Sequence, residues 1–108
     1  MGGVTPLLNG FLLKTQMHYV YIIHSDNDQF YIGYSSDLRA RITAHNEGQT
    51  KSTRGRIWKL VYYEAYLDEK SARHRERMLK HDDRTRRYLM ERVKESVKNH
   101  LVAGEAPN

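Results

Sequence analysis

The chain has no cysteine, only two prolines and one tryptophan, and no long apolar segment. Without cysteine, the protein forms no disulfide, no thiolate zinc site and no cysteine nucleophile. Because no apolar run approaches the roughly 20 residues that span a bilayer, we expect no membrane span and no membrane partner, and we predict a cytoplasmic protein. Residues 1–16 also lack the basic start and cleavage site of a secretory signal, and we interpret them as a flexible N-terminal extension.

Basic residues, by contrast, are abundant. Lys and Arg total 18 against 13 Asp and Glu, which gives a formal net charge of +5 at pH 7. The sequence pI of about 9.6 favours an anionic partner, and nucleic acid is the first candidate. A length of 108 residues suits a single small domain with one modest core.

Three segments predict strands. Residues 19–23 are uncharged and mostly β-branched or aromatic, which is typical of a central strand buried on both faces. The polar residues after them favour a turn, so residues 30–34 are expected to return as the second arm of a hairpin. Residues 58–66 form the third predicted strand. Since side chains alternate along strands, Tyr21 and Tyr31 are expected to be neighbours.

Three helices are predicted around these strands. The first follows the hairpin, is capped within residues 35–37, and runs to about residue 46 with Leu38 and Ile42 as its buried stripe. The second begins after the cap residue Asp68 and ends near residue 80. A third amphipathic helix follows a break at residues 81–83.

This order of elements predicts a fold of the α/β class, of the α+β type. We expect a small, three-stranded, mainly antiparallel sheet that is flanked by about three helices. The domain is predicted to cover residues 17–98, including the C-terminal amphipathic helix. Residues 99–108 are expected to form a flexible tail.

Five polar side chains lie next to apolar positions of these elements: Tyr21, Tyr31, Arg41, His45 and Glu76. Each has a plain structural interpretation when it is taken alone. A tyrosine in a strand packs in the core, Arg41 joins a salt bridge, and His45 is a solvated helix residue. Glu76 has the favourable spacing for an ion pair with Lys80, one helical turn further on.

Together the five residues supply what phosphodiester hydrolysis requires: a base for water, a fixed cation for the phosphate and help for the departing oxygen. Arg41 is the candidate cation, and Glu76 is the candidate metal ligand. Magnesium suits a single carboxylate because it keeps several waters and coordinates phosphate, and manganese is the alternative ion. The base stays open between Tyr31 and His45, since a phenol titrates near about 10 and needs a cation beside it, whereas imidazole titrates near neutrality.

The order of these residues resembles the GIY-YIG nuclease domain, particularly its small stand-alone bacterial members. The matching residues are Tyr19-Val20-Tyr21, Tyr31-Ile32-Gly33, Arg41 ten residues after Tyr31, His45-Asn46, and the helix residues Ala72, Arg75, Glu76 and Lys80. The similarity covers residues 17–80. The first triplet is YVY in place of GIY, and the late asparagine of longer relatives has no clear match.

The resemblance implies a mixed sheet-and-helix nuclease fold that uses one divalent metal. It implies that Tyr21 and Tyr31 line the pocket and that Arg41 steadies the phosphate. His45 would stand where relatives carry Tyr or His, and Glu76 would bind the metal. The family includes repair, homing and restriction nucleases, so the implied activity is DNA cleavage, and the resemblance does not choose among these classes. Our own expectation is structure-specific cutting linked to DNA repair or recombination. Because such relatives gain targeting from further domains, a protein partner for targeting is also expected, and the oligomeric state is left open.

Basic residues mark the surface expected to contact DNA: Lys51, Arg54, Arg56, Lys59, Arg73 and Lys80. The arginines of the second helix alternatively form a solvated face. A second hypothesis is a non-catalytic nucleic-acid-binding module that keeps the fold. A third is an interaction protein that docks a partner through the basic residues of the third helix, namely Arg84, Arg86, Arg87, Arg92, Lys94 and Lys98.

Overall fold

The computed structural model describes residues 15–105, whose centre is an antiparallel sheet. Its strands are β1 (His18–Ser25), β2 (Phe30–Ser35) and β3 (Trp58–Tyr66), in the order β2-β1-β3. Both neighbours of β1 run antiparallel to it. The predicted three-stranded sheet and the central place of its first strand are therefore confirmed.

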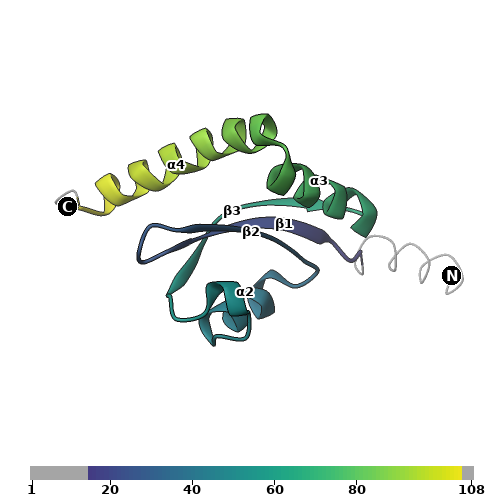
Figure 1. Cartoon of the computed structure of the whole chain (residues 1–108), viewed down its shortest axis with the longest axis horizontal. Helices are drawn as coiled ribbons and strands as arrows, with labels where there is room; N and C mark the ends of the chain where they lie inside the picture. The colour runs from purple at the N-terminus through teal and green to yellow at the C-terminus, as the bar shows by residue number, and fades with distance from the viewer. Residues whose placement is uncertain (1–14, 106–108) are drawn as a thin grey trace, which may run out of the picture.

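Three α-helices flank this sheet: α2 (Leu38–Asn46), α3 (Glu69–His81) and α4 (Asp83–Glu105). Figure 1 shows α3 and α4 on one side of the sheet and α2 on the other. Asp37 caps α2 by accepting from the amide of Ala40 at 3.1 Å, and Asp68 caps α3 by accepting from the amide of Ser71 at 2.8 Å. The predicted α+β fold is confirmed, including the predicted N-terminal caps of α2 and α3.

The core has two parts because helices cover both faces of β1. On the α3 face, Val20 packs with Ala72 and Leu79. The cluster on the α2 face consists of Tyr21, Ile23 and Trp58, with Leu38 and Ile42 packed against it. The central strand thus places a tyrosine inside the core that faces α2, with no part of its side chain exposed.

Helix α4 continues to Glu105, so the predicted end of this helix at residue 98 is wrong. The prediction followed the apolar periodicity, but residues 99–103 contain no glycine or proline that would end a helix. Near its start, Arg86 donates to the main-chain oxygen of Lys80 at 2.9 Å and so caps α3. Arg86, which the docking hypothesis places in a partner-binding surface, therefore stabilises the end of α3. The rest of the predicted extension and tail, residues 1–14 and 106–108, lies outside the described residues.

One carboxylate fastens α3 to β3. Glu64 accepts from the hydroxyls of Tyr62 (2.5 Å) and Tyr66 (2.7 Å), and Arg75 donates to it through Nε (2.9 Å) and Nη2 (2.8 Å). Burial alone would raise the pKa of Glu64, but the bonds from Arg75 and the two tyrosines lower it below its ordinary value. Because Arg75 directly precedes Glu76, this network fixes the part of α3 that carries Glu76, the candidate metal ligand, against β3.

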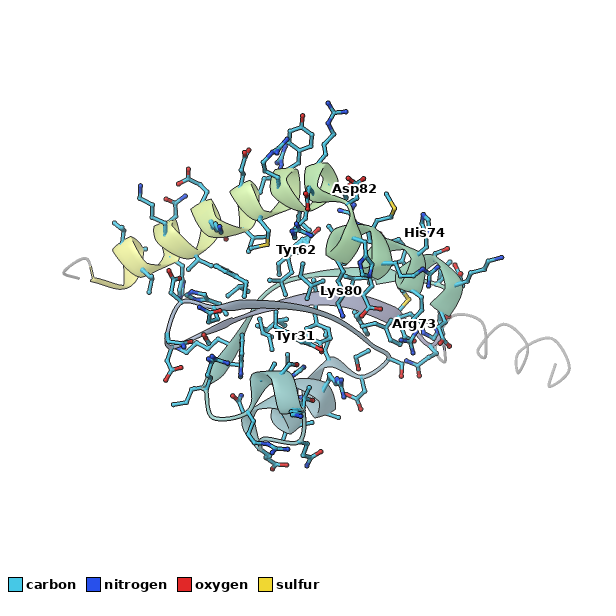
Figure 2. All side chains as sticks on the ribbon, in the orientation of Figure 1. Tyr31, Tyr62, Arg73, His74, Lys80 and Asp82 are labelled. Carbon is cyan, nitrogen blue, oxygen red and sulfur yellow. The ribbon has the colours of Figure 1, made fainter. Side chains whose placement is uncertain are left out.

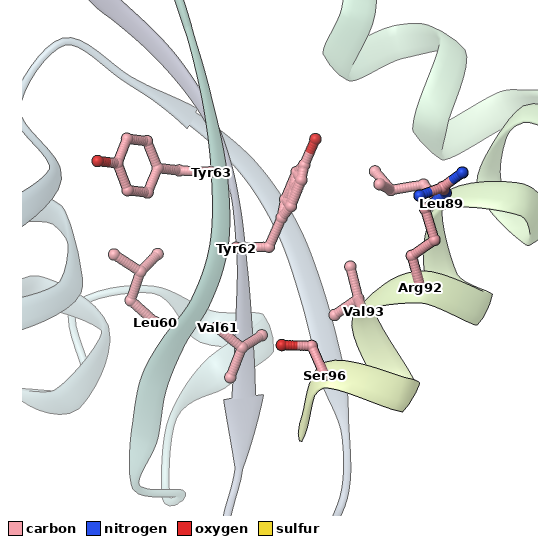
Figure 3. A pocket seen from close by; sticks show the side chains of 8 residues that line it. All are labelled: Leu60, Val61, Tyr62, Tyr63, Leu89, Arg92, Val93 and Ser96. Atoms are coloured by element: carbon pink, nitrogen blue, oxygen red, sulfur yellow. The ribbon is translucent and has the colours of Figure 1, made fainter. Parts of the chain in front are cut away.

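A mostly apolar cavity of about 490 Å³ lies between β3 and α4 (Figure 3). Its lining consists of Leu60, Val61, Tyr62, Tyr63, Leu89, Arg92, Val93 and Ser96. None of the five candidate site residues lines it, so this cavity is separate from the site described next. Within residues 15–105, no helix is both long and apolar enough to cross a membrane.

Candidate active site

Tyr21 lies at the centre of the candidate site. It is 0% exposed, and its hydroxyl oxygen is 2.7 Å from Nε2 of His45. Arg41 donates to the same hydroxyl through Nε at 3.4 Å. The ring centre of Tyr31, on the neighbouring strand, lies 6.4 Å from that of Tyr21 and 4.8 Å from that of His45. The hairpin and α2 thus bring four of the five predicted residues together, and the expected contact between Tyr21 and Tyr31 is confirmed.

Gly33 explains how the Tyr21 phenol fits between the strands. The two residues are direct partners in the β1–β2 ladder. A Cβ atom on Gly33 would lie 2.3 Å from the hydroxyl oxygen of Tyr21 and 2.5 Å from its Cζ. Gly33 is not among the glycines with positive φ, so the close approach of the phenol, and not the backbone conformation, requires glycine here.

His45 is enclosed by the protein. It is 0% exposed, with Nδ1 at 2.8 Å from Oγ1 of Thr53 and Nε2 at 2.7 Å from the hydroxyl of Tyr21. Burial lowers the pKa of His45, and the positive charge of Arg41 lowers it further. The interpretation of His45 as a solvated helix residue is therefore wrong. Since both ring nitrogens have protein partners, His45 reaches a reacting water only through Tyr21.

The pKa of the Tyr21 phenol also depends on Glu76, the residue that α3 contributes to the site. Burial raises the pKa of Tyr21 to about 12, while the hydrogen bond and the charge of Arg41 act in the opposite direction. The charges of Tyr31 and Glu76 raise the same pKa. Glu76 therefore lies within electrostatic range of the phenol that Arg41 and His45 contact. In the free protein, Tyr21 is protonated at neutral pH.

Glu76 approaches the site together with Lys80. The Glu76 side chain is 15% exposed, and its Oε2 is 3.1 Å from Nζ of Lys80. The same ammonium lies 5.5 Å from the centre of the Tyr31 ring. Figure 2 shows Lys80 and Tyr31 close to the ribbon of β2. The ion pair predicted from the helical spacing is confirmed, and Lys80 connects Glu76 to Tyr31.

The oxygen atoms beside Glu76 determine which metal this site suits. Among residues 15–105, no group of three or more His, Cys, Asp or Glu side chains is arranged to hold a metal ion. His45 is not a candidate ligand, because hydrogen bonds engage both of its nitrogens. What is left is the carboxylate of Glu76, within electrostatic range of the Tyr21 phenol, and both groups carry hard oxygen donors. This set fits Mg²⁺ or Mn²⁺, which bind through a single carboxylate, waters and substrate phosphate.

Three of the predicted DNA contacts lie in the loop between α2 and β3. Within this loop, residues Lys51–Thr53 form the short 3₁₀ helix η1. Lys51 and Arg54 are exposed, and Arg56 is partly exposed. Nε of Arg54 donates to the main-chain oxygen of Gly48 at 2.9 Å, which fixes the start of this side chain. These three basic side chains therefore reach the surface of the loop, and their contact with DNA stays a prediction.

The other three predicted contacts are arranged differently. Lys59 is exposed and lines a cavity with Ser96 and Val97 of α4, so the structure does not place it beside Lys51 and Arg54, and its contact with DNA stays a prediction. The guanidinium of Arg73 stacks 3.9 Å from the centre of the Tyr34 ring, and its Nε pairs with Glu69 at 3.2 Å. Lys80 pairs with Glu76, as described above. Arg73 and Lys80 therefore flank Glu76 on α3, and Lys59 faces α4 because strand side chains alternate.

Thr53 is a site residue that the sequence analysis missed. It is 0% exposed, although it sits in a polar loop between Lys51 and Arg54. Loop threonines are ordinarily solvated, and no spacing rule connects this one to His45. The only sequence signal is that Thr53 precedes Trp58 by five residues. The indole Nε1 of Trp58 donates to the main-chain oxygen of Thr53 at 2.8 Å.

Comparisons with known proteins identify the family of this chain. The family model described as the GIY-YIG catalytic domain matches residues 17–89. A UPF0213 protein of Clostridium perfringens is 42% identical over 66 residues, which cover 59% of this chain and 71% of the relative. A UPF0213 protein of Bacillus licheniformis is 32% identical over 89 residues, which cover 79% of this chain and 92% of the relative. The solution NMR structure of a UPF0213 protein from Bacillus halodurans is 35% identical and covers 69% of this chain and 83% of its own, with a TM-score of 0.45. The chain therefore belongs to the GIY-YIG family and to the UPF0213 proteins.

Proposed function

We propose that this protein is a metal-dependent DNA endonuclease that hydrolyses phosphodiester bonds. The observation that carries the proposal is the place of the Tyr21 hydroxyl, which contacts His45 and Arg41 while the charge of Glu76 reaches the same phenol. A fixed cation, phenols and a carboxylate around one point are the groups that phosphodiester hydrolysis uses. The match to the GIY-YIG catalytic domain supports the same activity.

The proposal gives each charged residue a role. Arg41 holds the phosphate, because Tyr21 orients its guanidinium and a guanidinium keeps its charge at any working pH. Glu76 would hold Mg²⁺ or Mn²⁺, which when bound stabilises negative charge on the phosphate and acidifies a bound water. Lys80 balances the charge of Glu76 in the free protein. The basic loop with Lys51 and Arg54 supplies further phosphate contacts.

Of the two candidate bases, Tyr31 fits better than His45. Tyr31 is partly exposed, and the ammonium of Lys80 lies 5.5 Å from its ring centre. His45 is fully buried and is bonded through both nitrogens. We therefore propose that Tyr31 accepts the proton from water and that His45 acts by holding Tyr21. We further propose that the protein cuts particular DNA structures during repair or recombination. We also propose that it is cytoplasmic and that a protein partner targets it to its DNA.

The test is a cleavage assay with nicked, flapped and branched DNA, with and without Mg²⁺. We expect the parent protein to cut in Mg²⁺ only, and we expect Glu76→Ala and Arg41→Ala to lose about 100-fold or more of the rate. Glu95→Ala is the control, because it removes an exposed carboxylate from α4. Cleavage that survives Glu76→Ala contradicts the mechanism. Salt-sensitive binding with no cleavage of any substrate supports the non-catalytic binding module instead.

A further inference from the structure

A buried chain of hydrogen bonds links Arg41 to the loop after α2. Thr53, His45 and Tyr21 are each 0% exposed. Oγ1 of Thr53 is 2.8 Å from Nδ1 of His45, and Nε2 of His45 is 2.7 Å from the hydroxyl of Tyr21. That hydroxyl is 3.4 Å from Nε of Arg41. Because these groups are buried, each proton in the chain has to be placed between the partners that the structure gives it.

Thr53, at the end of this series of hydrogen bonds, determines which atom donates and which accepts in each of them. The hydroxyl of Thr53 donates to the main-chain oxygen of Thr50 at 3.2 Å, and a carbonyl oxygen only accepts. Since Thr53 has a single hydroxyl proton, it faces His45 as an acceptor, and Nδ1 of His45 must carry the proton. Burial lowers the pKa of His45 and so favours its neutral form, which has only one N–H. Nε2 is therefore the acceptor for the hydroxyl proton of Tyr21.

This direction decides whether Tyr21 can hold Arg41. A guanidinium only donates, so the Tyr21 oxygen must turn a lone pair toward Arg41. It does so when its own proton points to Nε2 of His45. In the opposite tautomer, Nε2–H would donate to Tyr21, and the phenol proton would turn toward the N–H of Arg41. The phenol proton would then have lost its acceptor on His45 and would oppose the N–H of Arg41, which weakens the 3.4 Å contact between Tyr21 and Arg41.

The fold holds Thr53 firmly in this place. Nε1 of Trp58 donates to the main-chain oxygen of Thr53 at 2.8 Å. Asn46, the neighbour of His45 in the chain, bonds the main chain of Trp58 twice: it accepts from the amide at 2.7 Å and donates to the carbonyl at 3.0 Å. The end of α2, the loop and the start of β3 are thus fixed to one another around His45.

We propose that Thr53 is a positioning residue that acts on Arg41 through the tautomer of His45. By accepting from Nδ1, Thr53 keeps Nε2 unprotonated, so that Tyr21 remains an acceptor for Arg41. The last step, from Arg41 to the phosphate, rests on the proposed nuclease function. The tautomer of His45 does not rest on that function, and it is measurable in the free protein.

The first part of the test is ¹⁵N NMR of the imidazole nitrogens in the full chain at neutral pH. In the parent protein we expect the signals of a protonated Nδ1 and an unprotonated Nε2 for His45. Thr53→Ser keeps the hydroxyl and should keep this pattern, whereas Thr53→Val removes the acceptor at similar volume and should shift His45 toward the Nε2–H form. A parent protein with Nε2 protonated overturns the proposal without any need for a variant.

The second part measures single-turnover cleavage of flapped DNA in Mg²⁺. Thr53→Val should be slower than the parent by about 10- to 100-fold, the usual effect of losing an orienting partner, while its binding of DNA stays the same. Thr53→Ser should restore most of the rate. A Thr53→Val protein that is folded and keeps both the parent tautomer and the parent rate contradicts the proposal. If the parent cuts no DNA, the nuclease function fails, and the NMR result still decides the role of Thr53 toward His45.

Discussion

Replacing Gly33 with alanine should push the Tyr21 phenol out of the candidate site. The new Cβ would lie 2.3 Å from the hydroxyl oxygen, 2.5 Å from Cζ and 2.9 Å from Cε1 of Tyr21. These atoms cannot simply swing away, because the ring is fully buried and its hydroxyl is bonded to His45. Restoring ordinary van der Waals contact requires a shift of about 1 Å, which takes the 2.7 Å bond to His45 beyond hydrogen-bonding range.

The cost of this substitution follows from two effects. Overfilling a packed core typically costs about 1–3 kcal/mol. Loss of the buried bond between Tyr21 and His45 adds about 1 kcal/mol. We therefore expect Gly33→Ala to lower the free energy of unfolding by about 2–4 kcal/mol, and to slow DNA cleavage because Arg41 loses its acceptor.

Urea unfolding followed by circular dichroism measures the stability change. The matched control is Gly104→Ala, because a Cβ on Gly104 would meet no atom within 4 Å. This control lies in helix α4 and should be neutral or stabilising by up to about 1 kcal/mol. In a Tyr21→Leu background the cost of Gly33→Ala should fall, since the leucine side chain ends before the clashing ring atoms. A Gly33→Ala protein as stable as the parent, with the imidazole NMR signals of His45 unchanged, would refute the packing argument.

The remaining predictions concern pH, stability and metal binding. The folded-state pKa of His45 is lowered from 6.5, so unfolded chains bind more protons below that pH, and stability is lost as the pH falls. The advantage of the parent over His45→Gln in urea unfolding should shrink by up to about 1.4 kcal/mol per pH unit below pH 6.5, and a constant difference would contradict the buried neutral imidazole. Glu64→Gln weakens the charged bonds with Arg75 and should cost about 1.5–3 kcal/mol in the same assay, whereas an unchanged midpoint would mean that the network contributes nothing to stability. Lys80→Met removes the cation that pairs with Glu76, and Mn²⁺ titrated in a calorimeter should bind it more tightly than the parent; weaker binding would show that Lys80 supports the metal site.

Residues whose role depends on short-range pattern were predictable from the sequence. The alternation in β1 and β2 was enough to predict the contact between Tyr21 and Tyr31, because strand geometry fixes which side chains share a face. The four-residue spacing of Glu76 and Lys80 predicted their ion pair for the same kind of reason. Caps such as Asp37 and Asp68 were also visible, since each precedes its helix directly.

Residues whose role depends on contacts between segments that are distant in the sequence were not predictable. Thr53 meets His45 only because Asn46 and Trp58 fold the loop back over the end of α2. Burial of His45 likewise needs β3 and the loop to be in place, whereas helical spacing alone put it beside the apolar stripe. The end of α4 was missed because apolar periodicity reports burial against the sheet, while the helix itself continues without a breaker.

The central claim is that Glu76, brought from α3 to the phenols of the hairpin, makes this site a metal-dependent nuclease. Its most direct test is single-turnover cleavage of flapped DNA by the parent and by Glu76→Gln, both shown to be folded, at saturating Mg²⁺ and DNA. The claim predicts that the parent cuts only in Mg²⁺ and that Glu76→Gln cuts at least about 100-fold more slowly. Equal rates for the two proteins, or cutting by the parent in a chelator, would contradict it.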